Sequence, residues 1–318
     1  MKYFVTGGAG FIGSNYVNML LNGQLGENVE KVTVYDALTY AGDLRNLEDV
    51  KQDERFNFVR GNITDVPLLH EVLPGHDVVI NFAAESHVDR SIADPAAFIE
   101  TNVKGVQSLL DASMRCSITK FLQVSTDEVY GSIQTGSWTE ESPLEPNSPY
   151  AASKAAAELI VRAYVKTYNF NVVITRCSNN YGPRQYPEKI IPFFISKLLQ
   201  DEPVTLYGDG SNRRDWLHVD DHCRGVQIVL EKGATGESYN IGGGFELSNL
   251  ELTQHLLESL GKPQSLIEFV VDRLGHDFRY SVNDTKLRQL GYEPKVTFTE
   301  GIKTTIEWYK SHRDRLHV

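Results

Sequence analysis

A hydroxyl and two carboxyls follow one another in the stretch 125–131. The sequence there is Ser-Thr-Asp-Glu-Val-Tyr-Gly, so Thr126 is followed directly by Asp127 and Glu128. If their surroundings push the two carboxyl pKa values apart, one group can give a proton while the other takes one. Such a pair goes beyond what oxidation of an alcohol needs, and it indicates elimination of water. The alternative is an ordinary solvated loop or helix start.

A tyrosine and a lysine four residues apart open a long helical pattern after the turn-rich stretch 146–149. This spacing puts Tyr150 and Lys154 on one helical face. A neighbouring ammonium favours the phenolate, so we expect Lys154 to lower the pKa of Tyr150 and make it an acid/base near neutral pH. The same lysine can hold a nicotinamide ribose. The spacing also occurs by chance, and it gains meaning only with a cofactor loop upstream.

Such a loop stands at the start of the chain, where Gly7, Gly10 and Gly13 have the spacing G-x-x-G-x-x-G between a strand and a helix. Glycines there permit a tight turn and close approach of a pyrophosphate, which then faces the helix N-terminus. The alternative is a purely structural glycine turn. We expect a dinucleotide, with contacts also from Phe11 and Ile12.

Asp36 ends the next strand-like segment, 23 residues after Gly13. A carboxylate there accepts hydrogen bonds from ribose hydroxyls and repels a 2′-phosphate, which favours NAD over NADP. A turn or helix-capping Asp is the alternative. By position after the third and fourth strands, further cofactor contacts are expected from Asn62, Ile63, Ala83 and Ala84.

The segments that must position these residues alternate between strand and helix. We expect strands at 3–6, 32–35, 56–60, 78–82, 121–125 and 172–175, with helices at 12–21, 98–115 and 150–168. This alternation predicts an α/β fold, a Rossmann-type doubly wound parallel sheet. After residue 178 the pattern becomes mixed. We expect an NAD-binding domain at 1–178 and a smaller α/β substrate-binding lobe at 179–318, without a clean boundary. Expected strands of that lobe are 204–207, 239–241 and 267–271, and expected helices are 190–199, 220–231, 249–260 and 298–309.

The composition excludes several classes of function. The net charge is −11, which argues against nucleic acid as a partner. The three cysteines are widely spaced and match no disulfide or metal pattern. No signal-peptide pattern is present, and no apolar stretch approaches the ~18 residues of a membrane span. We therefore expect a cytoplasmic protein with no metal and no membrane partner.

Together these residues resemble the dTDP-glucose 4,6-dehydratases of the extended short-chain dehydrogenase/reductase superfamily. The resemblance covers almost the whole chain and rests on TGGAGFIGSN, LTYAG, FAAESHVDRSI, FIETNV, STDEVYG, YAASK, TRCSNNYGP, PEKIIP, YGDG, RDWLHVDDHCR, YNIGGG and GHD. It implies conversion of dTDP-glucose to dTDP-4-keto-6-deoxyglucose in deoxysugar biosynthesis.

The resemblance also implies a role for each group of the expected catalytic set. Tyr150, with Lys154 beside it and Thr126 orienting the sugar, takes the C4 hydroxyl proton while hydride passes to NAD. Glu128 then removes the C5 proton, and Asp127 protonates the C6 hydroxyl, which leaves as water. The hydride returns to C6, and Glu128 reprotonates C5.

A nucleotide-sugar site is implied in the same way. Arg214 and Arg273 are the expected diphosphate clamps, suited by the planar donor fork of arginine, although any single arginine can instead be a surface ion pair. Asn179 can also touch the nicotinamide. The expected substrate contacts are Ser86, Thr126, Asn179, Lys189, Tyr207, Arg214, Asn249, Arg273 and His276.

Four positions depart from the family pattern: Asn62, Arg184, Leu274 and Phe278. The last three are expected near the nucleotide sugar, so UDP-glucose stays open as a substrate. Two other functions stay open as well, a nucleotide-sugar 4-epimerase of the same superfamily and a non-catalytic NAD-binding module. The resemblance further implies a homodimer formed through 98–115 and 150–168.

Overall fold

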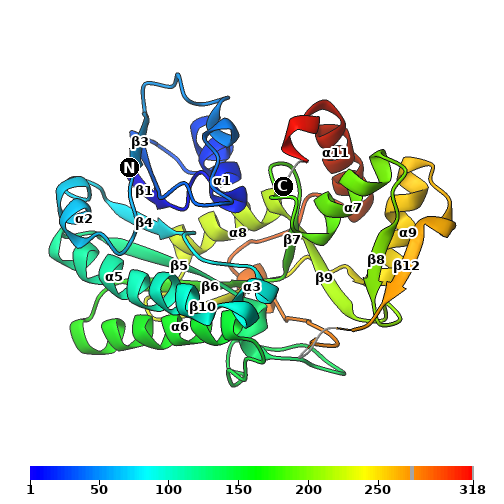
Figure 1. The fold of residues 1–318 in the computed structure, drawn as a ribbon. Helices are drawn as coiled ribbons and strands as arrows, with labels where there is room; N and C mark the ends of the chain where they lie inside the picture. The colour runs from blue at the N-terminus through cyan, green and yellow to red at the C-terminus, as the bar shows by residue number, and fades with distance from the viewer. Residues whose placement is uncertain (273–275, 317–318) are drawn as a thin grey trace.

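The computed structural model of the chain describes residues 1–272 and 276–316, and its largest element is a parallel sheet (Figure 1). Seven strands stand in the order β10-β6-β5-β4-β1-β2-β3, and every neighbouring pair is parallel. All strand carboxyl ends therefore meet at one edge. The strands are β1 (Lys2–Thr6), β2 (Lys31–Asp36), β3 (Phe56–Arg60), β4 (Val78–Asn81), β5 (Lys120–Thr126), β6 (Val172–Cys177) and β10 (Ser238–Ile241).

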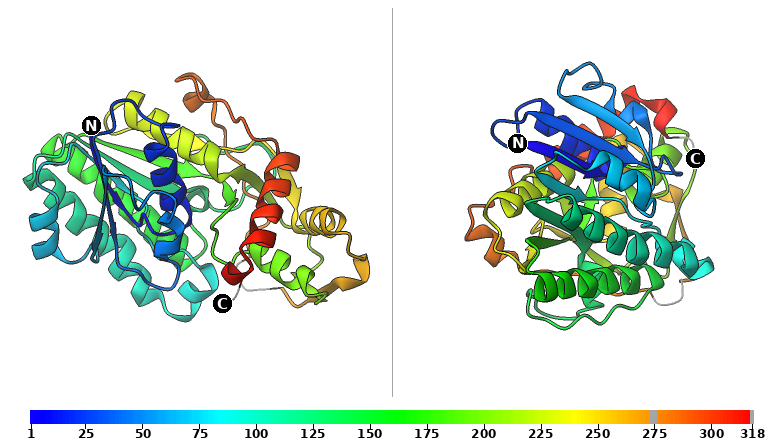
Figure 2. Two further views of the ribbon diagram at one scale, coloured as in Figure 1. Left: turned by 90° about the horizontal axis from the view of Figure 1, so that it is seen from above. Right: turned by 90° about the vertical axis from the view of Figure 1, so that its left-hand side faces the viewer.

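Helices cover both faces of this sheet, which confirms the doubly wound fold (Figure 2). One face packs against α1 (Phe11–Leu21) and α8 (Val219–Lys232). The other packs against α2 (Val66–Val72), α5 (Val106–Arg115) and α6 (Pro149–Tyr168). The central strands are apolar and buried on both sides, as in β4, where all four residues are buried.

The helix expected at 98–115 is not one regular α-helix. The chain forms α3 (Val88–Ala93), α4 (Pro95–Phe98), a π-helical stretch η2 (Ile99–Gly105) and then α5. In the π-helical stretch the buried Asn102 side chain bonds both backbone groups of Glu85 and the hydroxyl of Ser153. This stretch thus joins the segment after β4 to α6.

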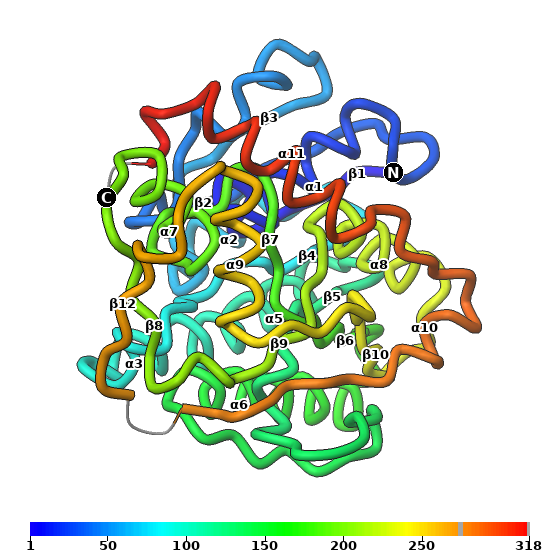
Figure 3. Tube along the Cα trace, turned by 90° about the vertical axis from the view of Figure 1, so that its right-hand side faces the viewer, coloured from blue at the N-terminus to red at the C-terminus, as the bar shows by residue number. Residues whose placement is uncertain are grey.

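A smaller lobe lies beside the sheet and faces the viewer in Figure 3. Its core joins helices to two small sheets, ordered β11-β9-β7 and β12-β8. Sequence reasoning missed β7, β9 and β11. The elements are β7 (Asn179–Tyr181), α7 (Ile190–Leu199), β8 (Val204–Tyr207), β9 (Arg213–His218), β11 (Glu246–Ser248), α9 (Asn249–Leu260), β12 (Ile267–Val270) and α11 (Phe298–Ser311).

Segments from the second half of the chain also belong to the large sheet. Helix α8 covers one face, and β10 forms an edge of the sheet beside β6. The division at 178 stays a prediction. None of the helices described is long and apolar enough to cross a membrane. The remaining short elements are η1 (Leu44–Leu47), η3 (Asp127–Tyr130), η4 (Gln264–Leu266), α10 (Thr285–Arg288) and η5 (Arg313–Arg315).

Candidate active site

A cavity of about 300 Å³ opens at the carboxyl ends of the parallel strands. Ligands of open α/β sheets bind at this edge. The cavity brings together all the expected cofactor and catalytic residues. They are Gly7, Gly10, Phe11, Ile12, Gly13, Asp36, Asn62, Ile63, Ala83, Ala84, Thr126, Asp127, Glu128, Tyr150, Lys154 and Asn179. Their assignment to a cofactor or a reaction step stays a prediction.

The glycine loop accepts no side chains at two of its positions. Gly7 has φ +66°, and a Cβ there would lie 2.6 Å from the backbone nitrogen of Ala83. A Cβ on Gly13 would lie 2.3 Å from the carbonyl oxygen of Gly7. Gly10 precedes α1 and cannot cap it with a side chain, so the first N–H groups of the helix stay available to an anion. The loop therefore fits a dinucleotide pyrophosphate.

Asp36 is buried at the end of β2 but keeps part of its acceptor capacity. It accepts hydrogen bonds from the backbone N–H groups of Ala9, at 2.9 Å, and Leu38, at 2.8 Å. A carboxylate has about four acceptor positions, so others remain for ribose hydroxyls. Burial raises the pKa of Asp36, and the two N–H bonds oppose that rise. These features fit an adenosine ribose with both hydroxyls free, as in NAD.

Asn62, one of the departures from the family pattern, lines the cavity with an amide. Its side-chain oxygen accepts hydrogen bonds from the N–H of Thr64 at 3.0 Å and from the hydroxyl of Thr64 at 2.9 Å. Its amide nitrogen can donate a hydrogen bond, which a carboxylate cannot do.

The acid–base pair lies on η3, directly after β5. The hydroxyl of Thr126 accepts the N–H of Glu128 at 3.3 Å and donates to Oδ1 of Asp127 at 3.4 Å. The other oxygen of Asp127 is buried and meets no hydrogen-bond partner within residues 1–272 and 276–316. Burial raises the pKa of Asp127 well above its ordinary value, and the charges of Glu128 and Asp215 raise it further. These surroundings favour the protonated form of Asp127.

Glu128 lies close to the other acid–base groups of the cavity. Burial is the main cause that raises the pKa values of Asp127, Tyr150 and Tyr280, and the charge of Glu128 is the next cause for each. One carboxyl group beside another whose pKa is raised is the arrangement that a base and an acid need to act on one substrate.

Tyr150 departs from the sequence expectation. Burial raises its pKa well above the ordinary value, Glu128 adds to the rise, and the Thr126 hydroxyl lowers it in part. Lys154 is not among the main causes of the Tyr150 shift. Its ammonium donates to the carbonyl of Val124 at 2.7 Å, and burial lowers the pKa of Lys154 to about 8. The expected lowering of the Tyr150 pKa by Lys154 is thus wrong for this structure.

The expected nucleotide-sugar contacts divide into two groups. Ser86, Asn179 and Lys189 line the cavity, and the Lys189 ammonium donates to the carbonyl of Ser86 at 2.9 Å. Four others are not brought to the cavity wall, and Arg273 and Leu274 lie outside the described residues. The four are Tyr207, Arg214, Asn249 and His276.

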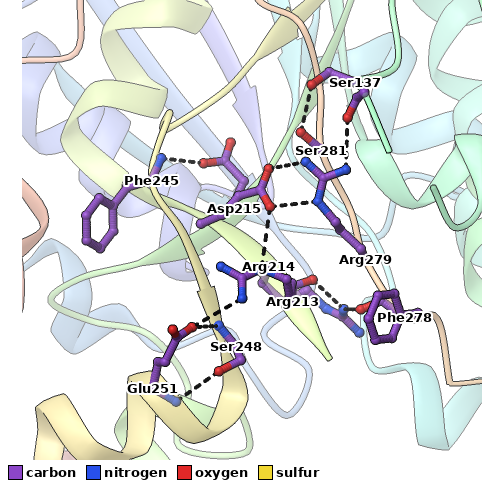
Figure 4. Close-up of polar contacts among 12 residues, drawn as sticks. Ser137, Arg213, Arg214, Asp215, Phe245, Ser248, Glu251, Phe278, Arg279 and Ser281 are labelled. Carbon is purple, nitrogen blue, oxygen red and sulfur yellow. Dashed lines mark hydrogen bonds and ion pairs between the residues drawn. The ribbon is translucent and has the colours of Figure 1, made fainter. Parts of the chain in front are cut away.

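Arg214 is buried, and its guanidinium is occupied by protein groups. It donates to the carbonyl of Phe278 at 3.3 Å (Figure 4). It also donates to the carbonyl of Asp277 at 2.9 Å and stacks 4.3 Å from the ring centroid of Tyr280. Its charge opposes the rise of the Asp127 pKa. The expected role as a diphosphate clamp stays a prediction.

Arg184, one of the departures from the family pattern, contacts helix α1 and Asp49. Its guanidinium bonds Asn15 of α1 at 3.0 Å and Asp49 at 2.8 Å, so it contacts the cofactor side of the molecule. The backbone of Arg184 has a φ of +72°. The described residues do not place the nucleotide sugar, so the expectation that Arg184 lies near it stays a prediction. Phe278 is exposed, and its N–H donates to the hydroxyl of Ser132.

Sequence reasoning missed an acidic and aromatic part of the cavity wall. Glu85 and Glu188 line it. Arg90 pairs with Glu188 at 3.2 Å and stacks 3.8 Å from the ring centroid of Tyr40. Burial raises the pKa values of Glu85 and Glu188. The stretches LTYAG, FAAESHVDRSI and PEKIIP contain these residues, but no periodicity marks them as neighbours. The described part of the chain holds no group of three His, Cys, Asp or Glu residues that could bind a metal.

Comparisons with known proteins agree with this geometry. The family model described as GDP-mannose 4,6 dehydratase matches residues 4–305. The dTDP-glucose 4,6-dehydratase of an Actinoplanes species is 56% identical over 316 residues, covering 98% of this chain and 99% of the relative. The crystal structure of the Streptomyces venezuelae dTDP-glucose 4,6-dehydratase, which contains NAD, has a TM-score of 0.97 at 54% identity and covers 99% of this chain and 98% of that one. A Thermotoga maritima UDP-glucose 4-epimerase has a TM-score of 0.90 at 31% identity, covering 98% of this chain and 100% of that one.

Proposed function

The chain belongs to the dTDP-glucose 4,6-dehydratase family, and from this premise we propose that it converts dTDP-glucose to dTDP-4-keto-6-deoxyglucose with NAD as cofactor. One observation carries the proposal. Asp127 is a buried carboxyl whose pKa is raised, with an oxygen that bonds no described residue, and it stands beside Glu128 in the cavity of Tyr150. An acid and a base facing one substrate are what removal of water requires.

The residues at the other end of the cavity fit NAD. Gly7, Gly10 and Gly13 with the N-terminus of α1 would hold the pyrophosphate, and Asp36 would hold the adenosine ribose. Lys154, fixed at the carbonyl of Val124, would lie near the nicotinamide ribose. Bound NAD would supply the acceptance and return of a hydride.

The protein side chains would move the protons. Tyr150, with Thr126 at its hydroxyl, would take the proton of the sugar C4 hydroxyl as a phenolate, the form that the positive charge of bound NAD would favour. A ketone at C4 makes the C5 proton acidic, and Glu128 would remove it. Asp127 would give its proton to the C6 hydroxyl, so that the C6–O bond breaks and water leaves. Glu128 would finally return a proton to C5.

A 4-epimerase is the competing function, since its fold is shared. Epimerisation inverts C4 and leaves the C6 hydroxyl in place, so it has no use for a protonated Asp127 beside Glu128. The same argument disfavours a non-catalytic NAD-binding module, because such a module would not need Tyr150 or either carboxyl in the cavity.

The test is incubation with dTDP-glucose and, separately, UDP-glucose, followed by mass spectrometry of the sugar nucleotide. We expect loss of one water from dTDP-glucose. Asp127→Asn and Glu128→Gln should still oxidise C4 but lose water ~10²–10⁴ times more slowly, whereas Tyr150→Phe should slow both steps. Inversion at C4 with unchanged mass would contradict the proposal. Faster water loss from UDP-glucose than from dTDP-glucose would make UDP-glucose the preferred substrate.

Further assignments rest on the same premise. We keep Ser86, Asn179, Lys189, Tyr207, Arg214, Asn249, Arg273 and His276 as proposed contacts of the nucleotide sugar, and a cytoplasmic location. We also keep a homodimer through η2, α5 and α6. It is supported by exposed apolar side chains on neighbouring helices, namely Ile92, Ile99, Leu159 and Tyr168.

A further inference from the structure

A salt bridge without any exposure to solvent lies behind the cavity. Arg176 of β6 and Glu158 of α6 both have fully buried side chains. The guanidinium grips the carboxylate with two nitrogens, Nε at 3.0 Å from Oε1 and Nη2 at 2.6 Å from Oε2. Apolar residues of similar volume often stabilise a protein as well as a buried ion pair does, so fold stability alone does not account for it.

One partner of the pair belongs to the helix of Tyr150. Tyr150, Lys154 and Glu158 follow at intervals of four residues on α6, so they share one face of the helix. The carboxylate of Glu158 also opposes the burial that lowers the pKa of Lys154. The position of Glu158 therefore fixes how this face of α6 meets β6.

The other partner reaches the turn that carries the acid and the base. Nη1 of Arg176 donates to the hydroxyl of Tyr130, and the guanidinium lies 4.7 Å from the centroid of the Tyr130 ring. The Tyr130 hydroxyl in turn donates to Oδ1 of Asn240 on β10 at 2.8 Å. Tyr130 is the last residue of η3, two residues after Glu128.

The same turn and the same helix also touch directly. Val129 and Tyr130 form a small apolar cluster with Ala155, which follows Lys154 in α6. The buried pair and this cluster thus link the two elements from which the proposed reaction takes its groups.

We propose that Arg176, Glu158 and the Tyr130 hydroxyl form a positioning network that holds η3, with Asp127 and Glu128, in register with the Tyr150 face of α6. This inference rests on the proposed dehydratase function. Oxidation at C4 needs groups of α6 and the cofactor end. Water loss needs the carboxyls of η3 over the same sugar. Weakening the link between η3 and α6 therefore slows water loss more than oxidation.

The test uses Tyr130→Phe in the full-length protein. This change keeps the ring that stacks 6.0 Å from Trp138, but it removes the hydroxyl between Arg176 and Asn240. We expect water loss to slow about 10- to 100-fold, as small displacements of reacting groups do, with C4 oxidation near the wild-type rate. Two signals show the split. Reduced-nicotinamide absorbance rises normally and then persists, and solvent deuterium enters C5 slowly.

A second variant and a matched control complete the test. Arg176→Lys keeps the positive charge but cannot bond the Glu158 carboxylate through two nitrogens of one planar group. It should therefore also slow water loss more than C4 oxidation. Tyr16→Phe removes another buried tyrosine hydroxyl, which bonds Gln227 of α8 and touches neither η3 nor α6, so it should leave both rates unchanged.

Equal slowing of both steps in Tyr130→Phe and Arg176→Lys would overturn the positioning role, and so would no slowing at all. The same split in Tyr16→Phe would overturn it too. A wild-type protein that oxidises C4 but releases no water would instead refute the proposed function.

Discussion

The two ends of the cavity are built from different parts of the chain. At the cofactor end the shape comes from backbone, since Gly7 and Gly13 leave room that any Cβ would fill. At the acid–base end the chemistry comes from buried side chains, Asp127 and Tyr150, whose proton affinities are set by burial and by Glu128. The first end is therefore sensitive to volume and the second to charge.

Two glycine substitutions in one loop test the role of volume, and they carry the largest expected effect on stability. Gly13→Ala places a Cβ 2.3 Å from a backbone oxygen that cannot move alone. We expect a loss of about 3 kcal/mol in the free energy of unfolding and loss of bound NAD. Urea unfolding and extraction of nucleotide from purified protein measure both.

Gly10→Ala is the matched control. Its Cβ meets only the Gly7 carbonyl, at 3.3 Å, and φ is −78°. The variant should fold with nearly wild-type stability yet bind NAD more weakly, because the added methyl group lies where the helix N-terminus meets the pyrophosphate. Equal stability losses in both variants would show that the loop is not shaped as described.

The contrast between the two ends also explains what the sequence could predict. The strands of the large sheet are apolar and the residues after them fall at one edge, so the cavity wall could be predicted from Gly7 to Lys154. Strand β9 (Arg213–His218) carries charged and aromatic residues and pairs with two strands of only three residues each, so no periodicity marked it.

Side-chain partners distant in sequence were beyond such reasoning. Arg184 bonds Asn15, 169 positions away, and Arg214 bonds the carbonyl of Asp277, 63 positions away. The pKa of Tyr150 depends on burial and on Glu128, whereas the helical spacing suggested only Lys154. Such partners escape prediction because helical periodicity gives neighbours within one element but not the partners supplied by another.

Asp36→Asn tests whether a charge also matters at the cofactor end. The carboxylate bonds two N–H groups, of Ala9 and Leu38, through different oxygens. An amide has one oxygen, so one N–H would face an NH₂ group and lose its acceptor. We expect a loss of about 1–3 kcal/mol in stability, measured by urea unfolding.

Asp201→Asn is the control, at an exposed position with φ +59° that Asn tolerates. It should lower the free energy of unfolding by less than about 0.5 kcal/mol. Similar losses of unfolding free energy in the two variants would mean that the hydrogen bonds of Asp36 contribute little to stability.

Asp127→Asn should stabilise the protein, whereas Asp36→Asn destabilises it. The gain in the free energy of unfolding should be smallest near pH 4. The folded pKa of Asp127 is raised by burial, by Glu128 and by Asp215, while in the unfolded chain it returns to about 3.9. Between these two values the folded protein holds a proton that the unfolded protein has lost. Stability contributed by this group is therefore complete below the unfolded pKa and falls as pH rises toward the folded pKa.

The amide cannot ionise, so the Asn variant escapes this loss. Its stability relative to wild type should grow with pH through that window, by about 1.4 kcal/mol for each pKa unit between the two states, and then level off. Urea unfolding of both proteins at steps from about pH 4 to about pH 8 measures the difference. Asp36→Asn provides the comparison, because the N–H bond that it breaks makes that variant less stable than wild type. Parallel curves for wild type and Asp127→Asn would mean that Asp127 is ionised in the folded protein across this range. The acid–base end would then lack the protonated carboxyl that water elimination requires.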